Sequence, residues 1–274
     1  GDGRQYGVSL EVFPRLEEAV KREGGRLSAS LMLTWADHAR LAKSYARAEE
    51  LYGAYMDSVC DSTSRNRVRY YMAECRIGQG DFAGAIETLQ NLALDDSLGE
   101  YGGRAVRKIG DLYYDKGLFV AAIAAYRRYV QLPHHRGADA MLFRIGTIYQ
   151  DKFSQYGSAV RQFEELLKRY ASSSYTHRAV LRVAQCYESL GEYQAALRNY
   201  RYVVESSDQP VLTERASARA TYLETYRIKD VEAAAYALAE LAGPLIGSGE
   251  VGLRNYGDLL ADTEPGRLDL WLGE

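Results

Sequence analysis

The histidines of this sequence are few, and none has the spacing of a metal site or a catalytic pair. His38 and His177 are isolated and form neither an HExxH motif nor another paired-ligand spacing. His134 and His135 are adjacent, but they follow a predicted helix in a connecting segment, where neighbouring histidines ordinarily face solvent. A catalytic site needs an acid, a base, a nucleophile or a metal ion within mutual reach. The histidines therefore predict neither a metal site nor acid–base catalysis.

The three cysteines give no sign of metal or redox chemistry. They are far apart and lack CxxC spacing: Cys60, Cys75 and Cys186. We expect buried or half-buried thiols rather than a disulfide framework or a structural zinc site. Their redox state and the redox compartment are left open by this pattern.

One glycine-rich segment and two acidic pairs have simpler interpretations than catalysis. The segment 78–84 lacks GxGxxG spacing and a preceding strand, and it falls where a turn between helices is expected. Asp95 and Asp96 are adjacent, and Asp111 and Asp115 are spaced i, i+4, which places two like charges on one helical surface. Such a surface favours a basic segment of a ligand, and arginines beside it favour acidic segments. We therefore expect no enzyme activity, no cofactor and no metal.

The composition indicates a folded helical protein whose partner is another protein. Hydrophobic residues make up 47% and charged residues 26% of the 274 positions, and only five are proline. The formal net charge of -3 gives no electrostatic reason to expect nucleic acid or an anionic membrane as the partner. No apolar run approaches the roughly 20 residues of a membrane span, so we expect no membrane insertion. The chain begins at Gly1 without methionine, which leaves an upstream signal peptide, lipid anchor or further domain open.

A repeat of 37 residues organises most of the chain. An aromatic residue stands three positions before an alanine in five copies, at Tyr45-x-x-Ala48, Phe82-x-x-Ala85, Phe119-x-x-Ala122, Tyr156-x-x-Ala159 and Tyr193-x-x-Ala196. A sixth copy, Val231-x-x-Ala234, is degenerate. Large residues follow each alanine by four and seven positions, which is one stripe on a helix of period 3.6. In the five complete copies they are Tyr52 and Tyr55, Leu89 and Leu92, Tyr126 and Tyr129, Phe163 and Leu166, and Tyr200 and Val203.

A second helix precedes each of these. Small residues recur 12 or 13 positions before the first five alanines, where they allow two helices to approach closely: Ala36, Ala73, Gly110, Gly146 and Ala184. Glycines mark the turn within three of the pairs, at Gly80, Gly117 and Gly191. Prolines are expected near the ends of the later helix of each pair: Pro133, Pro210 and Pro244. Each copy is thus predicted to be an antiparallel helix pair.

These residues resemble the tetratricopeptide repeat, which has small residues at position 8, an aromatic at 17, alanine at 20 and a large residue at 24. The resemblance covers about residues 29–247, with a period of 37 where 34 is usual. The tryptophan usual at position 4 is replaced by Met32, Arg69, Val106, Leu142, Val180 and Ala218. The resemblance implies an all-α fold, an α-α superhelix of about six helix-turn-helix repeats.

The predicted boundaries follow from this register. Residues 1–28 are expected to form an N-terminal capping helix with a stripe of Val12, Phe13, Leu16, Ala19 and Val20. The six repeats are expected at about 29–64, 65–101, 102–138, 139–175, 176–212 and 213–247. Residues 248–274 are expected to form a C-terminal capping helix and a tail that contains Trp271.

In tetratricopeptide arrays the first helices line a groove for partner proteins. Carried over residue by residue, the resemblance places these side chains on that surface: Arg67, Tyr70, Glu74, Arg104, Arg107, Asp111, Tyr114, Asp115, Phe143, Arg178, Arg219, Leu223, Tyr226 and Arg227. Position 9 carries no asparagine, so a clamp for a chaperone's C-terminal carboxylate is not expected. Each arginine taken alone is equally consistent with ordinary solvated surface. Tyrosine and arginine together are typical of binding hot spots.

The segment from Phe163 to Tyr175 resembles bacterial cell-envelope members of the family, including outer-membrane assembly lipoproteins and the periplasmic coordinator of cell division. Those proteins usually have Tyr-Pro where this chain has Tyr170-Ala171. We therefore predict a protein-binding scaffold, in a periplasmic or outer-membrane-associated setting rather than the cytoplasm. The alternative is a structural module that self-assembles through its end faces and the Trp271 tail.

Overall fold

The structure is a computed structural model that describes residues 12–20, 22–24, 27–57, 61–97, 99–133 and 136–228. Every regular element among these residues is helical, as predicted. The chain divides into two compact units, residues 1–136 and 137–274, and each is described by itself. No helix in the described ranges is both long and apolar enough to cross a membrane.

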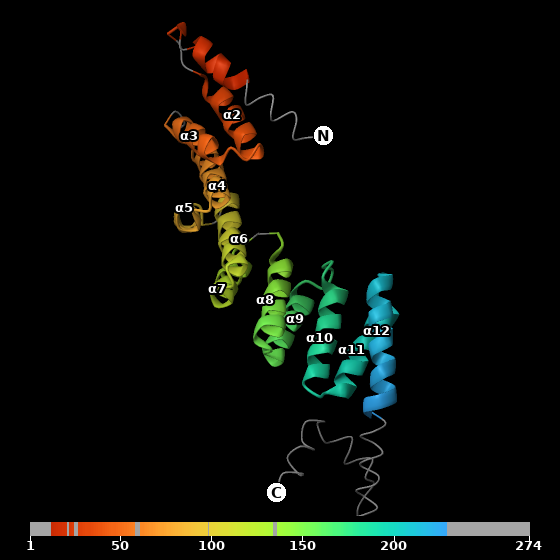
Figure 1. Ribbon diagram of the computed structural model, residues 1–274. Coiled ribbons are helices and arrows are strands. Elements are labelled where there is room, and N and C mark those ends of the chain that lie inside the picture. The colour runs from red at the N-terminus through yellow and green to blue at the C-terminus, as the bar shows by residue number, and fades with distance from the viewer. Residues whose placement is uncertain are drawn as a thin grey trace, which may run out of the picture. The chain divides into compact units, whose positions relative to one another are not determined.

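The first unit contains three antiparallel helix pairs (Figure 1). They are α2 (Ala29–Leu41) with α3 (Tyr45–Met56), α4 (Ser62–Gln79) with α5 (Phe82–Asp95), and α6 (Glu100–Asp115) with α7 (Phe119–Gln131). Consecutive helices pack on each other throughout, and α4 also contacts α6. Residues 12–20 form a further helical segment. Its Phe13 ring stacks on Trp35 at 5.5 Å, while Val12 and Leu16, which the predicted stripe included, are 54% and 37% exposed.

The second unit repeats the arrangement (Figure 1). It contains α8 (Ala138–Phe153) with α9 (Tyr156–Arg169), α10 (Thr176–Ser189) with α11 (Tyr193–Ser206), and α12 (Pro210–Leu223), which a short π-helical turn, η1 (Glu224–Ile228), extends. Consecutive helices from α8 to α12 pack on each other, and α10 also contacts α12. The predicted sixth second helix at Val231 and Ala234, Pro244 and the predicted C-terminal helix and tail lie outside the described residues.

The core includes the residues that the repeat predicted. The five repeat alanines are fully buried, and so is the large residue four positions after each. Each of these alanines lies in the first turn of a second helix, so the stripe it begins faces the paired first helix. The small residues of the first helices are buried as well, and they let the facing rings come close. A Cβ atom at Gly110 would lie 2.5 Å from a ring carbon of Tyr126.

The turns within the pairs need left-handed backbone, which glycine adopts most readily. The three predicted glycines have it, with φ of 83° at Gly80, 74° at Gly117 and 80° at Gly191. Lys43 and Ser154 adopt the same region in the other two turns, at φ of 63° and 51°. Glycine spacing could not reveal these two turns. Pro133 follows α7, whereas Pro210 occupies the first turn of α12, where a missing N–H costs little. Pro210 also follows shortly after α11, which ends at Ser206, so both prolines lie near the end of a second helix, as predicted.

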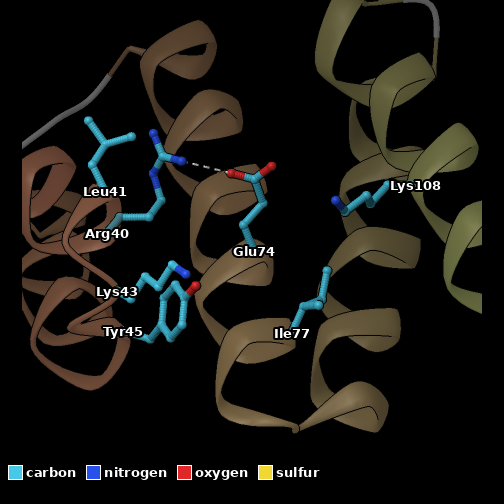
Figure 2. A pocket seen from close by; sticks show the side chains of 7 residues that line it. All are labelled: Arg40, Leu41, Lys43, Tyr45, Glu74, Ile77 and Lys108. Carbon is cyan, nitrogen blue, oxygen red and sulfur yellow. Dashed lines mark hydrogen bonds and ion pairs between the residues drawn. The ribbon is translucent and has the colours of Figure 1, made fainter. Parts of the chain in front are cut away.

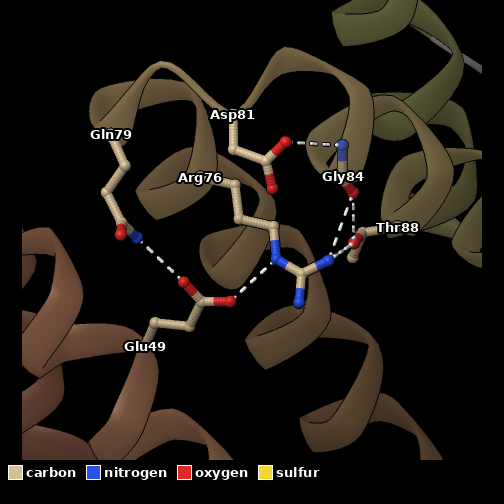
Figure 3. A network of polar contacts seen from close by, with 6 residues as sticks. All are labelled: Glu49, Arg76, Gln79, Asp81, Gly84 and Thr88. Atoms are coloured by element: carbon tan, nitrogen blue, oxygen red, sulfur yellow. Dashed lines mark hydrogen bonds and ion pairs between the residues drawn. The ribbon is translucent and has the colours of Figure 1, made fainter.

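A polar network connects three helices of the first unit (Figure 3). Arg76 on α4 donates to Glu49 on α3 at 2.7 Å and to Thr88 on α5 at 2.8 Å. Gln79 donates to the other oxygen of Glu49 at 2.8 Å. At the turn, Asp81 accepts a hydrogen bond from the backbone N–H of Gly84 and so caps the start of α5. The glycine-containing segment 78–84 therefore has the structural role that the sequence predicted.

The sixth first helix packs in another register than predicted. Counting back from Val231-x-x-Ala234 placed Leu223 on the open surface and Ala218 at position 4. In the structure the buried stripe of α12 runs through Ala216, Ala220 and Leu223. These are spaced i, i+4, i+7, so they form a single helical face that packs on Val180, Ala184 and Tyr200. The degenerate sixth copy was a poor guide to this register.

Candidate protein-binding surface

The predicted site residues lie on the first helices of the repeats. We call the parts of α2, α4, α6, α8, α10 and α12 that are not covered by the second helices the first-helix surface, taken separately in each unit. Eleven of the fourteen predicted residues have partly or fully exposed side chains there or on η1. The other three are buried. The contacts below show which of them come together.

In the first unit, Asp37 on α2 connects three elements. Its carboxylate accepts a 2.5 Å hydrogen bond from the hydroxyl of Tyr52 on α3, and it lies 3.9 Å from the predicted site residue Arg67 on α4. Burial, together with the hydrogen bond to Asp37, raises the pKa of Tyr52 above its usual value. The Tyr52 hydroxyl in turn accepts from Nε of Arg40 at 3.2 Å. The surface acid is therefore held in place by a buried phenol.

The predicted residue Glu74 is part of an ion pair. Arg40 on α2 donates to Glu74 on α4 at 3.1 Å (Figure 2). The Arg40 guanidinium also lies 4.2 Å from the ring centre of Tyr71. Beside this pair is a hollow of about 250 Å³, whose rim includes Lys43 and, from α6, Lys108. Glu74 thus shares the lining of this hollow with three cations and pairs with one of them, Arg40.

Tyr70 and Arg104 form a stack with a third residue that the sequence analysis did not select. The Arg104 guanidinium lies 4.7 Å from the ring centre of Tyr70 and 5.1 Å from that of Tyr101. Arg104 also lies 3.4 Å from Glu100. Burial raises the pKa of Tyr70 above its usual value. Cation–π contacts of this kind are favourable by about 0.5–1 kcal/mol at exposed sites.

The remaining predicted residues of the first unit lie on α6. Arg107 is 55% exposed and lies 4.0 Å from Asp111, which accepts a 2.8 Å hydrogen bond from Tyr126. The ring of Tyr114 meets that of Phe119 edge-on at 5.5 Å. Asp115 is exposed. Asp111 therefore helps to hold α7 on α6.

In the second unit, the same kind of stack recurs. The Arg178 guanidinium lies 4.9 Å from the ring centre of Phe143 and 5.3 Å from that of Tyr175. The two rings themselves are 5.1 Å apart. Arg178 is exposed, whereas Phe143 lies beneath it. Both units thus hold an arginine over a pair of aromatic rings from adjacent first helices.

The predicted residue Arg219 borders a second hollow. Arg219 lies 3.2 Å from Glu188 through its Nε, and Glu188 also accepts a 2.8 Å hydrogen bond from the buried Tyr200. Burial raises the pKa of Tyr200 above its usual value. The hollow between α10, α11 and α12 has a volume of about 590 Å³.

Two predicted residues lie on η1. Tyr226 is exposed, and its ring lies 5.5 Å from that of Tyr222. Arg227 lies 5.6 Å from the ring centre of Tyr193. Arg219 is also 4.8 Å from the Tyr222 ring, so aromatic rings and guanidinium groups alternate at this end of the described chain as well.

Three predicted surface residues are buried, which corrects the predicted site. Tyr70 is 7%, Phe143 8% and Leu223 0% exposed. The first two are covered because an arginine lies over each ring, and Leu223 is covered because α12 packs in its shifted register. They support the surface from below and present little area to a partner.

The structure also adds surface residues that the sequence analysis passed over. Tyr101 and Tyr175 each stand three residues before the arginine that covers them, so the recurrence Tyr-x-x-Arg at the start of two first helices was an available signal. Arg182 carried no such signal, because its partners Gln150 and Asp151 come from another repeat. Arg40 and Arg215 have no aromatic residue at this spacing either. The acidic pair Asp95 and Asp96 has structural roles, since Asp95 binds Arg69 at 2.6 Å and Asp96 accepts from the N–H of Gly102.

Within the described ranges, no group of three or more His, Cys, Asp or Glu side chains is placed to share a metal ion. Cys75 and Cys186 are buried free thiols, as expected, and burial raises the pKa of each to about 12. Cys60 and the pair His134 and His135 lie outside the described residues. The first-helix surface thus presents ion pairs and stacked rings, and such groups can bind a ligand through non-covalent contacts.

A tetratricopeptide repeat family model matches residues 72–137 and 149–210 of this sequence. These two segments are therefore similar to tetratricopeptide repeats. The matched segments cover the second to fifth helix pairs for the most part, where the repeat is most regular. No curated protein sequence matches the chain.

Solved structures show the same fold at low sequence identity. The C-terminal part of a TPR repeat-containing protein from Cytophaga hutchinsonii is 16% identical, with a TM-score of 0.57 over 83% of this chain and 94% of that one. A tetratricopeptide repeat protein from Parabacteroides merdae is 16% identical, with a TM-score of 0.52 over 79% of each chain. BtubC (BKLC) from P. vanneervenii is 13% identical, with a TM-score of 0.50 over 82% of this chain and 92% of that one. These similarities establish the all-α tetratricopeptide solenoid fold.

Proposed function

We propose that this chain is a non-enzymatic scaffold that binds a segment of a partner protein on its first-helix surface. The observation that carries the proposal is the arginine-on-aromatic stack that recurs in both units, Arg104 over Tyr70 and Tyr101, and Arg178 over Phe143 and Tyr175. A guanidinium held over rings loses less conformational entropy when a ligand binds. Arginine and tyrosine are also the residue types that dominate protein-binding hot spots.

The net charge of -3 supports a protein rather than a nucleic acid as the partner. The residues proposed to contact it are the exposed members of the predicted set, listed as Arg67, Glu74, Arg104, Arg107, Asp111, Tyr114, Asp115, Arg178, Arg219, Tyr226 and Arg227. Tyr70, Phe143 and Leu223 act beneath this surface.

Site-specific photocrosslinking in the source cell tests the proposal. A benzoylphenylalanine replaces Arg107 or Arg178 on the first-helix surface of each unit. The matched controls replace Val120, which is 74% exposed on α7, or Arg161, which is exposed on α9. We expect the two first-helix positions to crosslink to the same partner protein and the two controls to give none. Crosslinks at the control positions alone would overturn the proposal.

Self-assembly is the alternative, and the same experiment separates it. Crosslinks from Arg107 and Arg178 only to a second copy of this chain, with a molecular mass by light scattering that rises with concentration, would favour a self-assembling module. A monomer that crosslinks to another protein would favour the scaffold.

We also propose a bacterial cell-envelope setting, periplasmic or outer-membrane-associated. Its support is the resemblance of the segment from Phe163 to Tyr175 to envelope members of the family. Fractionation of the source cells, followed by immunoblotting for this chain, tests the setting. Recovery in the cytoplasmic fraction with a cytoplasmic marker would contradict it.

A further inference from the structure

The hollow of the second unit between α10, α11 and α12 has three cations among its lining residues. Arg182 on α10 and Arg215 and Arg219 on α12 face a space of about 590 Å³, together with a single carboxylate, that of Glu188. This volume is within the range of ordinary ligand-binding clefts, about 300–1,000 Å³. The hollow is formed entirely within the second unit, by α10, α11 and α12.

The internal partners of these arginines leave positive charge available. Glu188 is occupied by Arg219 and by the hydroxyl of Tyr200. Arg182 uses its Nη1 atom for Asp151 at 2.9 Å and Gln150 at 3.2 Å. Arg215 makes no hydrogen bond or ion pair with any described residue, although it lines the hollow. A guanidinium carries five N–H donors, so donors remain at all three arginines.

The first unit contains a hollow of the same charge composition. Arg40, Lys43 and Lys108 line it with Glu74, which is already paired with Arg40 at 3.1 Å (Figure 2). Its volume is smaller, about 250 Å³. The chain as a whole is acidic, with a formal net charge of -3. Each hollow has three cations and one acid that is already paired, so both hollows are basic although the chain carries a net negative charge.

We propose that the segment bound by the first-helix surface is acidic, and that its Asp or Glu side chains pair with Arg182, Arg215 and Arg219 in the hollow of the second unit. This inference rests on the proposed function and names the chemistry of the partner. The guanidinium fork matches a carboxylate in a bidentate geometry. Carboxylates on separate residues can meet α10 and α12 while they avoid Glu188. A single small anion would have to lie among all these groups at once.

Fluorescence anisotropy of the full-length protein with labelled hexaglutamate tests this inference, with hexaglutamine and hexalysine as comparison peptides. We expect hexaglutamate to bind at least about tenfold more tightly than either, and its affinity to fall as salt rises from 50 to 300 mM because the charges are screened. The variant Arg215→Ala removes the unpaired cation without leaving a carboxylate alone, and it should weaken hexaglutamate about fivefold, the upper value for one exposed pair. The matched control Arg161→Ala, on α9 outside the hollow, should change it less than twofold.

Three outcomes of these measurements would overturn the inference, and a fourth would separate it from the proposed scaffold function. Equal affinity for hexaglutamate and hexaglutamine, or an equal loss in Arg215→Ala and Arg161→Ala, would overturn the inference. Displacement of hexaglutamate by 5 mM inorganic phosphate, but not by 5 mM chloride, would assign the hollow to a small anion and would also overturn it. Circular dichroism checks that each variant is folded. If hexaglutamate fails to bind while the photocrosslinks at Arg107 and Arg178 persist, the scaffold function stands and only the acidic partner is excluded.

Discussion

The ring of Phe163 lies against Gly146 so closely that a Cβ atom at Gly146 would be 2.5 Å from its Cε1 atom. Gly146 belongs to α8 and Phe163 to α9. Because Gly146 has no side chain, the Phe163 ring can pack directly against the backbone of α8. The same relationship holds between Gly110 and Tyr126 in the first unit. A glycine inside a helix costs about 1 kcal/mol relative to alanine, and here the packing of the facing ring offsets it.

Replacement of Gly146 by alanine should therefore destabilise the protein. Overpacking costs about 1–3 kcal/mol, and the gain in helix propensity recovers at most about 1 kcal/mol, so we expect a net loss of about 1–2 kcal/mol in the free energy of unfolding by urea. Gly53→Ala is the matched control, because nothing lies within 4 Å of a Cβ there. It should be neutral or stabilising. A Gly146→Ala variant as stable as Gly53→Ala would show that the contact is relaxed in solution.

Tyr52→Phe should remove the hydrogen bond that fixes Asp37 on the first-helix surface. Because the hydroxyl is also the acceptor for Arg40, we expect a loss of about 1–2 kcal/mol in the free energy of unfolding. Tyr202→Phe, at a 49% exposed ring on α11, is the control and should have no measurable effect. Equal stabilities of the two variants would contradict the assigned role of Tyr52.

Arg76→Ala should loosen the connection between α3, α4 and α5. The change removes the hydrogen bonds to Glu49 and Thr88, for which we expect a loss of about 1–2 kcal/mol in urea unfolding. Arg65→Ala, on an exposed position of the same helix, should stay within about 0.5 kcal/mol of the parent. If both substitutions have the same small effect, the network in Figure 3 contributes no net stability.

The buried thiols predict slow labelling and a fall in stability at alkaline pH. Burial raises the pKa of Cys75 and of Cys186 to about 12, so the folded protein keeps both protons where the unfolded chain has lost them. Below about pH 8.5, the usual cysteine pKa, this contribution is fully present. As the pH rises above that value, the unfolded state binds fewer protons than the folded state, and stability falls.

The measurement uses a Cys60→Ser variant, so that the label reports only Cys75 and Cys186. At pH 8, iodoacetamide should modify both residues at least about a hundredfold more slowly in the native protein than in 6 M urea, as followed by peptide mass spectrometry. Labelling at similar rates in the two conditions would show that these thiols are accessible.

The sequence by itself determined the all-α fold, the helix pairs and most of the core. The reason is that an alanine followed at four and seven positions by large apolar residues specifies one buried helical stripe, and five copies at a fixed spacing specify a repeated helix pair. The sequence also predicted the turns at Gly80, Gly117 and Gly191, because a left-handed turn depends only on the backbone preference of one residue.

Only the tertiary structure decided which side chains of the first-helix surface are exposed to solvent. Position in a repeat places Tyr70 and Phe143 toward the groove, but Arg104 and Arg178 from the next first helix cover them. The basic hollow of Arg182, Arg215 and Arg219 likewise joins residues of two repeats. Such contacts depend on the distance and rotation between neighbouring helices, and no spacing within a single helix encodes them.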